Sequence, residues 1–131
     1  MLKDMHINME LANGSKNEYI IRDKLGITIG RINIIYASKE NKYCYAKIKF
    51  YRDDSEGVLY LKEAIKLFID SLFRDKQIYK INISVDEETA KGPFSDLGFI
   101  LEGIITDSIF YNNLRKSELL FGINYNIYGS L

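Results

Sequence analysis

The sequence has little of what would cross-link a chain, anchor it in a membrane or hold a metal ion. It contains one cysteine, Cys44, so no disulfide can form within the chain, and the alternation around it favours a small buried side chain. Its one histidine, His6, has no second histidine with which to share a metal ion. No apolar run is long enough for a membrane span or a signal peptide, so we expect a cytoplasmic protein that does not contact a membrane.

An excess of charge of either sign is missing as well. The 18 basic and 18 acidic residues give a formal net charge of zero. Proteins that bind nucleic acid through its phosphates usually carry a basic surplus, so nucleic acid is not an expected partner. The 131 residues, 47% of them hydrophobic, are enough to bury one core, and the sequence therefore predicts a single domain over residues 1–131.

Alternating apolar and polar residues predict most of the strands. Between residues 42 and 51, for example, Cys44, Ala46 and Ile48 face one way while tyrosines and lysines face the other, which is typical of a strand with one buried face. Strands are predicted over residues 3–11, 18–23, 27–36, 42–51, 79–85, 99–110 and 118–125. Short polar links join residues 18–36 and 99–125 into two hairpins.

A period near 3.6 predicts a helix of about five turns after residue 55. Asp53, Asp54 and Ser55 are good capping residues at its start. Its apolar stripe consists of Val58, Leu61, Ala64, Ile65, Phe68, Ile69 and Leu72. A short helix is predicted over residues 87–97, with Gly98 as a left-handed cap.

This order of elements predicts an α/β (α+β) fold with a single mixed, mostly antiparallel sheet of about seven strands, one long helix and one short helix. The strands at 42–51 and 79–85 are joined through the long helix. We therefore expect them to be parallel neighbours, connected by a right-handed crossover, and to diverge near residues 48–50.

Two segments carry a resemblance to a known family. Glu63-Ala64-Ile65 lies inside the long helix and ahead of the 79–85 strand, and Phe94-Ser95-Asp96-Leu97-Gly98-Phe99 is followed by Leu101-Glu102-Gly103. Together with the order of elements over residues 18–125, they resemble the GNAT superfamily of N-acetyltransferases, and within it the branch of the ribosomal-protein-alanine acetyltransferases. The resemblance implies transfer of an acetyl group from acetyl-CoA to an amine, with a protein or peptide N-terminus as a candidate acceptor.

The same resemblance implies where the cofactor binds. In the family, the main chain of the fourth strand and a glycine-containing turn before the long helix hold acetyl-CoA. The matching residues of this chain are Ile48, Lys49, Phe50, Arg52, Gly57 and Val58. The turn departs from the family's pattern, because Glu56 takes the place of a basic or amide residue and Leu59 the place of a glycine. Asp53 and Asp54 add carboxylates that repel phosphate, and in the alternative interpretation these acids only cap the helix.

Two further positions depart from the family. Glu87 stands where many members have an asparagine that contacts the pantetheine arm, and Phe94 stands where many have a tyrosine that protonates the leaving thiolate. No general base is identified, although Glu18, Glu102 and Asp107 are candidates by residue type. Two hypotheses therefore stand beside the acetyltransferase: a catalytically degenerate GNAT-like module for interaction or oligomerisation, and a small-molecule sensor.

The first two strands are separated by residues 12–17 alone, where family members usually have two helices. The acceptor side should therefore be open, and a homodimer is expected because the missing helices leave apolar surface uncovered. Five tyrosines are candidates to line this open groove: Tyr43, Tyr45, Tyr51, Tyr111 and Tyr125.

Overall fold

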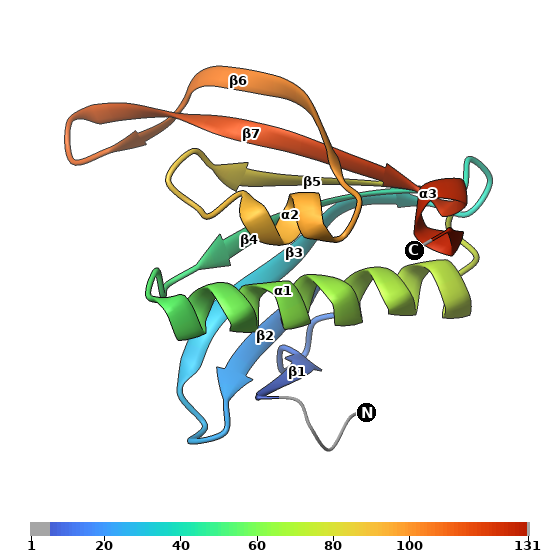
Figure 1. Ribbon diagram of the computed structural model, residues 1–131, viewed down its shortest axis with the longest axis horizontal. Helices are drawn as coiled ribbons and strands as arrows, with labels where there is room; N and C mark the ends of the chain where they lie inside the picture. The colour runs from blue at the N-terminus through green and yellow to red at the C-terminus, as the bar shows by residue number, and fades with distance from the viewer. Residues whose placement is uncertain (1–5, 131) are drawn as a thin grey trace.

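One seven-stranded sheet organises the molecule, in the strand order β1-β2-β3-β4-β5-β7-β6 (Figure 1). The computed structural model describes residues 6–130, apart from the side chains of residues 108–111. The strands are β1 (Ile7–Leu11), β2 (Glu18–Asp23), β3 (Thr28–Ser38), β4 (Tyr43–Phe50), β5 (Lys80–Asp86), β6 (Ile100–Tyr111) and β7 (Leu114–Asn124). The helices are α1 (Ser55–Asp70), which continues into the π-helical turn η2 (Ser71–Asp75), α2 (Gly92–Asp96) and α3 (Tyr125–Gly129). The predicted mixed α/β fold is confirmed.

The first hairpin has no helix in its connection. β1 pairs directly with β2, and the Ser15 hydroxyl accepts hydrogen bonds from the backbone N–H groups of Asn17 and Glu18 in the turn between them. The expected loss of the two intervening helices is therefore confirmed. The described part of β1 begins at Ile7, and residues 3–5 of the predicted strand lie outside the described residues.

β4 and β5 are parallel neighbours that separate towards their C-terminal ends. Their pairing runs from Tyr43 opposite Lys80 to Lys47 opposite Ser84. Beyond Lys47, β4 stays paired with β3 as far as Phe50, while β5 stays paired with β7 as far as Asp86. The sheet therefore splits between two well-held strands, as predicted, and the edge of β4 that faced β5 is free beyond the bridge between Lys47 and Ser84.

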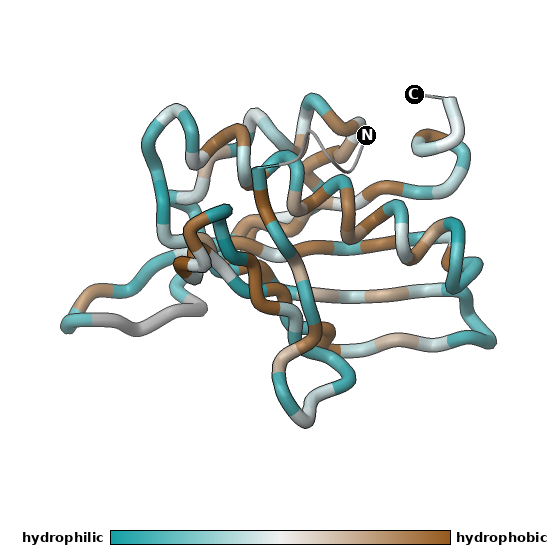
Figure 2. The backbone as a smooth tube through the Cα atoms, turned by 90° about the horizontal axis from the view of Figure 1, so that it is seen from below, coloured by the Kyte–Doolittle hydropathy of each residue, from teal (hydrophilic) through white to brown (hydrophobic). Residues whose placement is uncertain are grey.

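The long helix packs its predicted stripe against one face of the sheet. Leu61, Ala64, Ile65, Phe68 and Ile69 are all buried, and Leu72 and Phe73 extend the same buried surface into η2. α1 and α2 lie on the same face of the sheet (Figure 1). Figure 2 shows apolar stretches gathered where α1 passes the strands, and polar stretches at the chain turns. Within residues 6–130, this one-sided covering leaves the opposite face of the sheet without helices.

Three elements differ from the prediction. Residues 87–91 form a turn instead of the first part of a helix, because the Asp86 carboxylate accepts hydrogen bonds from the backbone N–H groups of Glu88 and Thr89. α3 was not predicted, and its N-cap is Asn124, whose side chain accepts from the N–H of Ile127. β7 starts at Leu114 instead of residue 118, because a two-residue turn replaces the expected longer link. Gly98 has a φ of +91°, which confirms the predicted left-handed cap.

Candidate functional site

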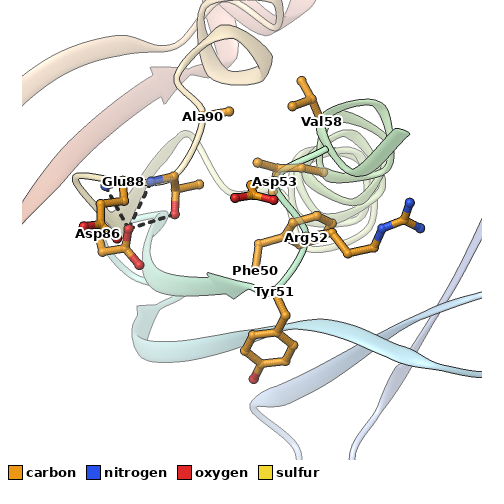
Figure 3. A pocket seen from close by; sticks show the side chains of 10 residues that line it. Phe50, Tyr51, Arg52, Asp53, Val58, Asp86, Glu88 and Ala90 are labelled. Carbon is orange, nitrogen blue, oxygen red and sulfur yellow. Dashed lines mark hydrogen bonds between the residues drawn. The ribbon is translucent and has the colours of Figure 1, made fainter. Parts of the chain in front are cut away.

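A cavity of about 300 Å³ lies where β4 and β5 separate (Figure 3). Its walls come from three places: the end of β4 with the segment that leads to α1, the first turns of α1, and the turn after β5. The lining residues are Phe50, Tyr51, Arg52, Asp53, Val58, Leu61, Asp86, Glu88, Thr89 and Ala90. This end of the sheet is therefore hollow where the free edge of β4 meets a helix N-terminus.

The start of α1 is organised by a carboxylate cap. The Asp54 side chain accepts a hydrogen bond from the Gly57 N–H at 3.0 Å and forms an ion pair with Arg52 at 2.7 Å. The hydrogen bond from Arg52 lowers the pKa of Asp54 below its usual value. The Arg52 guanidinium also lies over the Tyr60 ring, 5.0 Å from its centre, and the Tyr60 hydroxyl donates to Glu56. The predicted capping role of Asp54 is thus observed.

The cavity wall is acidic. Asp53, Asp86 and Glu88 all line it, and Figure 3 shows Asp53 pointing into the space between the end of β4 and the turn after β5. Arg52 is the basic lining residue, but its guanidinium points away from the cavity towards Asp54 (Figure 3). Glu88 forms an ion pair with Lys116 at 2.9 Å, which offsets part of this negative charge.

The predicted cofactor residues divide into two groups. Phe50, Arg52 and Val58 line the cavity, whereas Ile48, Lys49 and Gly57 do not. Ile48 is buried against the helices, and Lys49 is exposed. Gly57 is covered by Arg52 and Asp54, and a Cβ added there would lie 2.7 Å from each of those side chains. As cofactor contacts these residues stay predictions.

Sequence reasoning missed the lining residues that follow β5. Asp86, Glu88, Thr89 and Ala90 reach the cavity because residues 87–91 form a turn, whereas a helix was predicted there. Asp86 followed by Glu88 and Thr89 carried a usable signal, since an aspartate often accepts hydrogen bonds from the N–H groups of the next residues in a turn.

Glu87 and Phe94, which stand where many family members have an asparagine and a tyrosine, do not line the cavity. The Glu87 carboxylate accepts a hydrogen bond from the Ser117 N–H, and the Glu87 N–H donates to the Ser117 carbonyl, so Glu87 is tied to β7. Phe94 is fully buried and stacks on Phe121 with ring centres 4.5 Å apart. A tyrosine hydroxyl in that exact place would be enclosed by the core.

A ladder of polar side chains crosses the face of the sheet opposite α1 and α2. The Tyr43 hydroxyl donates to the Asn82 amide oxygen at 2.8 Å, and the Asn82 nitrogen donates to Glu102 at 2.9 Å. Glu102 also pairs with Lys80. Closer to the split, the Tyr45 and Ser84 hydroxyls are 3.0 Å apart, and Lys47 forms an ion pair with Glu118 at 3.3 Å. We call this surface the open face.

None of the three acids considered from the sequence is placed as a free base at the split. Glu18 pairs with Arg31 at 3.2 Å on β2 and β3. Burial opposes ionisation of Glu102, but hydrogen bonds from Lys80 and Asn82 outweigh it and lower the pKa of Glu102. Asp107 is exposed where β6 is irregular, with a φ of +54°.

The tyrosines proposed to line the acceptor groove lie in different places, and that role stays a prediction. Tyr43 and Tyr45 belong to the open face, whereas Tyr125 lies in α3, with its ring 6.0 Å from that of Phe73. Figure 3 shows the Tyr51 ring pointing away from the other cavity residues. The side chain of Tyr111 lies outside the described residues.

The role of Cys44 follows from its burial, and the question of a membrane span from the length of the helices. Cys44 is fully buried, and burial raises the pKa of its thiol to about 11, so it is a core residue and no nucleophile. Within residues 6–130, no helix is long and apolar enough to cross a membrane.

Comparison with known proteins identifies the fold and the family. No protein-family model matches the chain, and no curated protein matches it. Among solved structures, the N-terminal domain of the ribosomal-protein-alanine acetyltransferase from Clostridium acetobutylicum is similar over 95% of both chains, with 44% sequence identity and a TM-score of 0.90.

More distant structures share the fold. The spermidine/spermine N-acetyltransferase from Vibrio cholerae, solved with manganese ions, is 19% identical over 90% of this chain and 71% of its own, with a TM-score of 0.68. A dodecameric spermidine N-acetyltransferase from the same organism is 18% identical over 85% of this chain and 66% of its own, with a TM-score of 0.66. The strand order with a split between β4 and β5, and the 44% identity over nearly the whole chain, lead to one conclusion: the chain belongs to the GNAT superfamily of N-acetyltransferases, in the branch of the ribosomal-protein-alanine acetyltransferases.

Proposed function

We propose that this chain transfers an acetyl group from acetyl-CoA to a primary amine, with the N-terminal amine of a protein or peptide as the acceptor. The observation that carries the proposal is the separation of β4 and β5 beyond Lys47, with a cavity at the free edge of β4. Family membership supports the reaction class, and the name of the Clostridium relative supports an alanine N-terminus as the acceptor.

The free edge of β4 suits the pantetheine arm of acetyl-CoA. Pairing with β5 ends at the bridge between Lys47 and Ser84, so backbone groups farther along that edge of β4 are available to a ligand that takes the place of a strand. Phe50 and Val58 add an apolar wall to the cavity. Lys49 and Arg52 are the nearby cations for the phosphates, and Arg52 has to leave Asp54 to reach them.

The reaction is a direct transfer. The acceptor nitrogen forms a bond to the thioester carbonyl carbon and the carbon–sulfur bond breaks, so the acetyl group moves and coenzyme A leaves as a thiolate. The nitrogen loses a proton to a carboxylate or a water molecule, and the thiolate takes a proton from solvent, since Phe94 has none to give. A backbone N–H at the free edge of β4 polarises the carbonyl oxygen.

Calorimetric titration with acetyl-CoA tests the donor site, and a transfer assay tests the reaction. We expect binding in the micromolar range, and a mass increase of one acetyl group on a short peptide amide that begins with alanine. The same peptide with its N-terminus already acetylated is the matched control and should gain nothing. No binding of acetyl-CoA together with no modified peptide would contradict the proposal.

The acidic cavity favours a second candidate, a GNAT-fold module or sensor without catalysis. Asp53, Asp86 and Glu88 repel phosphate, and Phe94 cannot act as an acid in the core. The titration separates the two forms of this candidate from the enzyme. Binding without transfer identifies a sensor, and the absence of binding identifies an interaction module.

We further propose that the chain is one domain that pairs as a homodimer. Strand β6 lies at the edge of the sheet and exposes several large apolar side chains: Ile100, Leu101, Ile104 and Ile105. The spermidine N-acetyltransferase from Vibrio cholerae is a dodecamer, which gives the fold a precedent for self-association.

A further inference from the structure

The ion pair between Lys47 and Glu118 stands at the mouth of the split in the sheet. Lys47 is the last residue of β4 that pairs with β5, and Glu118 on β7 lies opposite Asp86, the last residue of β5. The Lys47 ammonium therefore reaches past β5 to meet a carboxylate on β7, on the open face. The ion pair therefore lies on the open face, beside the last bridge between β4 and β5.

Glu118 is a buried carboxylate with a loosely held partner. Its side chain is 9% exposed, whereas that of Lys47 is 43% exposed. The Lys47 Nζ atom lies 3.3 Å from one Glu118 oxygen and 3.5 Å from the other, longer than the 2.7–2.9 Å or so of a strong charge-assisted hydrogen bond. A buried carboxylate needs a cation, and this one is met by an ammonium on a flexible stem that can swing into solvent.

The contrast with Glu102 makes Glu118 distinctive. Glu102 lies on the same open face, but Lys80 and the Asn82 amide both bind it, and it sits beside the part of β5 that is still paired with β4. Its hydrogen bonds tie β5 to β6 and serve the sheet. Glu118 instead lies opposite the end of β5 beyond its pairing with β4, and its cation comes from β4 on the other side of β5.

We propose that Glu118 is the acceptor-amine subsite, and that the Lys47 ammonium holds the place that the acceptor's primary amine takes on binding. This inference rests on the proposed function, because it assigns the acceptor side of the same reaction. The ligand class is a primary amine that binds as its ammonium ion, and the lysine side chain is itself such a group. Glu118 then orients the nitrogen towards the free edge of β4, and Lys47 moves into solvent.

Peptide binding without any donor tests the subsite. The probe is a short peptide amide that begins with alanine, titrated calorimetrically into the full chain, and its N-acetylated form is the control ligand. We expect Glu118→Gln to weaken binding by about tenfold or more, because the amide keeps the shape and loses the charge. Glu118→Asp should restore part of the affinity. Lys47→Met should bind the peptide at least as tightly as the unaltered chain, because it removes the competing ammonium.

Glu102→Gln is the matched variant, since it removes an ion-paired carboxylate from the same face away from the split. It should leave peptide affinity within about twofold. Thermal unfolding of each variant checks the fold, and Glu118→Asp serves if Glu118→Gln does not fold. Unchanged affinity in both Glu118 variants, weaker binding in Lys47→Met, or no binding of the peptide by the unaltered chain would each overturn the inference.

The outcome is separable from that of the proposed function. If acetyl transfer occurs and Glu118→Gln leaves the KM for the peptide unchanged, the subsite is wrong and the acetyltransferase stands. If acetyl-CoA does not bind and peptide binding still depends on Glu118 as described, the subsite stands and the acetyltransferase is wrong.

Discussion

At the scale of single residues, Gly57, which the resemblance assigned to a cofactor-binding turn, has a packing role. A Cβ at this position would lie 2.7 Å from the Arg52 Cβ, 2.7 Å from an Asp54 carboxylate oxygen and 2.9 Å from the Arg52 carbonyl oxygen. Two of these atoms, the Arg52 carbonyl oxygen and the Arg52 Cβ, are fixed by the main chain and cannot move aside easily. Glycine is therefore needed for the Asp54 cap to close over the start of α1.

The first prediction is that Gly57→Ala lowers the free energy of unfolding by about 1–2 kcal/mol, because it disturbs the cap and crowds the turn. Helix propensity alone predicts a change of about 1 kcal/mol in the opposite direction, so the sign is informative. Urea unfolding measures it. Gly92→Ala is the control, since nothing lies within 4 Å of an added Cβ there. A stabilised Gly57→Ala variant would contradict the packing role.

Glu102 gives a prediction on acid stability. Its carboxylate lies over Gly122 of β7, where a side chain would collide with it, and reaches Asn82 and Lys80 on β5. Its folded-state pKa is lowered, because the hydrogen bonds from Lys80 and Asn82 outweigh the effect of burial. A lowered pKa means that the unfolded chain binds a proton more readily, so the stabilisation is present above the unfolded pKa and is lost as the pH falls through the folded one.

We therefore expect the unaltered protein to be more stable than Glu102→Gln near neutral pH, and this difference to shrink as the pH falls below about 4.3, the ordinary value for a glutamate. Unfolding free energies of both proteins across this range provide the measurement. Glu10→Gln, which removes a more exposed carboxylate from the Arg22 pair, is the control and should show a smaller dependence. A difference that is constant with pH would show that the Glu102 charge does not stabilise the fold.

At the scale of elements, the N-terminus of α1 and the turn after β5 together set the charge of the cavity. Of the three acids that the sequence placed near this terminus, Asp54 caps the helix and Glu56 accepts from Tyr60, so both are engaged outside the cavity. Asp53 alone lines the cavity, where Asp86 and Glu88 join it. A phosphate in the cavity would therefore be repelled by Asp53 more than by Asp54 or Glu56.

We predict that Asp53→Asn strengthens acetyl-CoA binding several-fold. A carboxylate and a phosphate about 5 Å apart repel by roughly 3 kcal/mol at an effective dielectric near 20, and salt screening reduces this to a smaller net gain. Calorimetry at two salt concentrations measures the effect, which should shrink at the higher one. Asp75→Asn, in η2 at the other end of α1, is the control and should change nothing. Equal affinities for Asp53→Asn and the unaltered chain would place the phosphates elsewhere.

How far the sequence predicts the elements depends on how much of each is set by local pattern. β2 was predicted with its observed bounds, and β4 to within one residue at each end, because alternation with one buried face is a strong signal. α3 was missed because its 5 residues are too few for a helical period to show. Residues 87–91 were predicted as helix, but the Asp86 side chain binds the N–H groups that a helix would have used.

The site was less predictable than the fold, because less of it is set by local sequence pattern. The end of β4 was identified from the resemblance, and Phe50, Arg52 and Val58 do line the cavity. The opposite wall depends on a turn stabilised by one side chain, and Glu118 depends on a strand register that brings it across the sheet to Lys47. Contacts of this kind, between residues far apart in the chain, leave no local pattern in a single sequence.

At the scale of the whole molecule, the one-sided covering of the sheet bears on assembly. The helices lie on one face, the link between β1 and β2 carries none, and β6 ends the sheet with Ile100, Leu101, Ile104 and Ile105 exposed. The pairing of β6 with β7 is irregular after Leu101 and again after Ile105. Such irregularities hinder edge-to-edge extension of a sheet, so contact between side-chain surfaces is the expected mode of association.

We predict that the chain is a dimer at tens of micromolar, and that Ile104→Lys makes it a monomer. Ile104 is 57% exposed on the edge strand β6, and a charge there would have to be buried without a partner at the interface. Leu25→Lys is the control, because Leu25 is 84% exposed in the turn between β2 and β3 and should be replaceable without effect. Light scattering gives the mass of each. A monomeric unaltered chain would refute the dimer, and a dimeric Ile104→Lys variant would place its interface on another surface, with the open face around Tyr43 and Tyr45 the next to test.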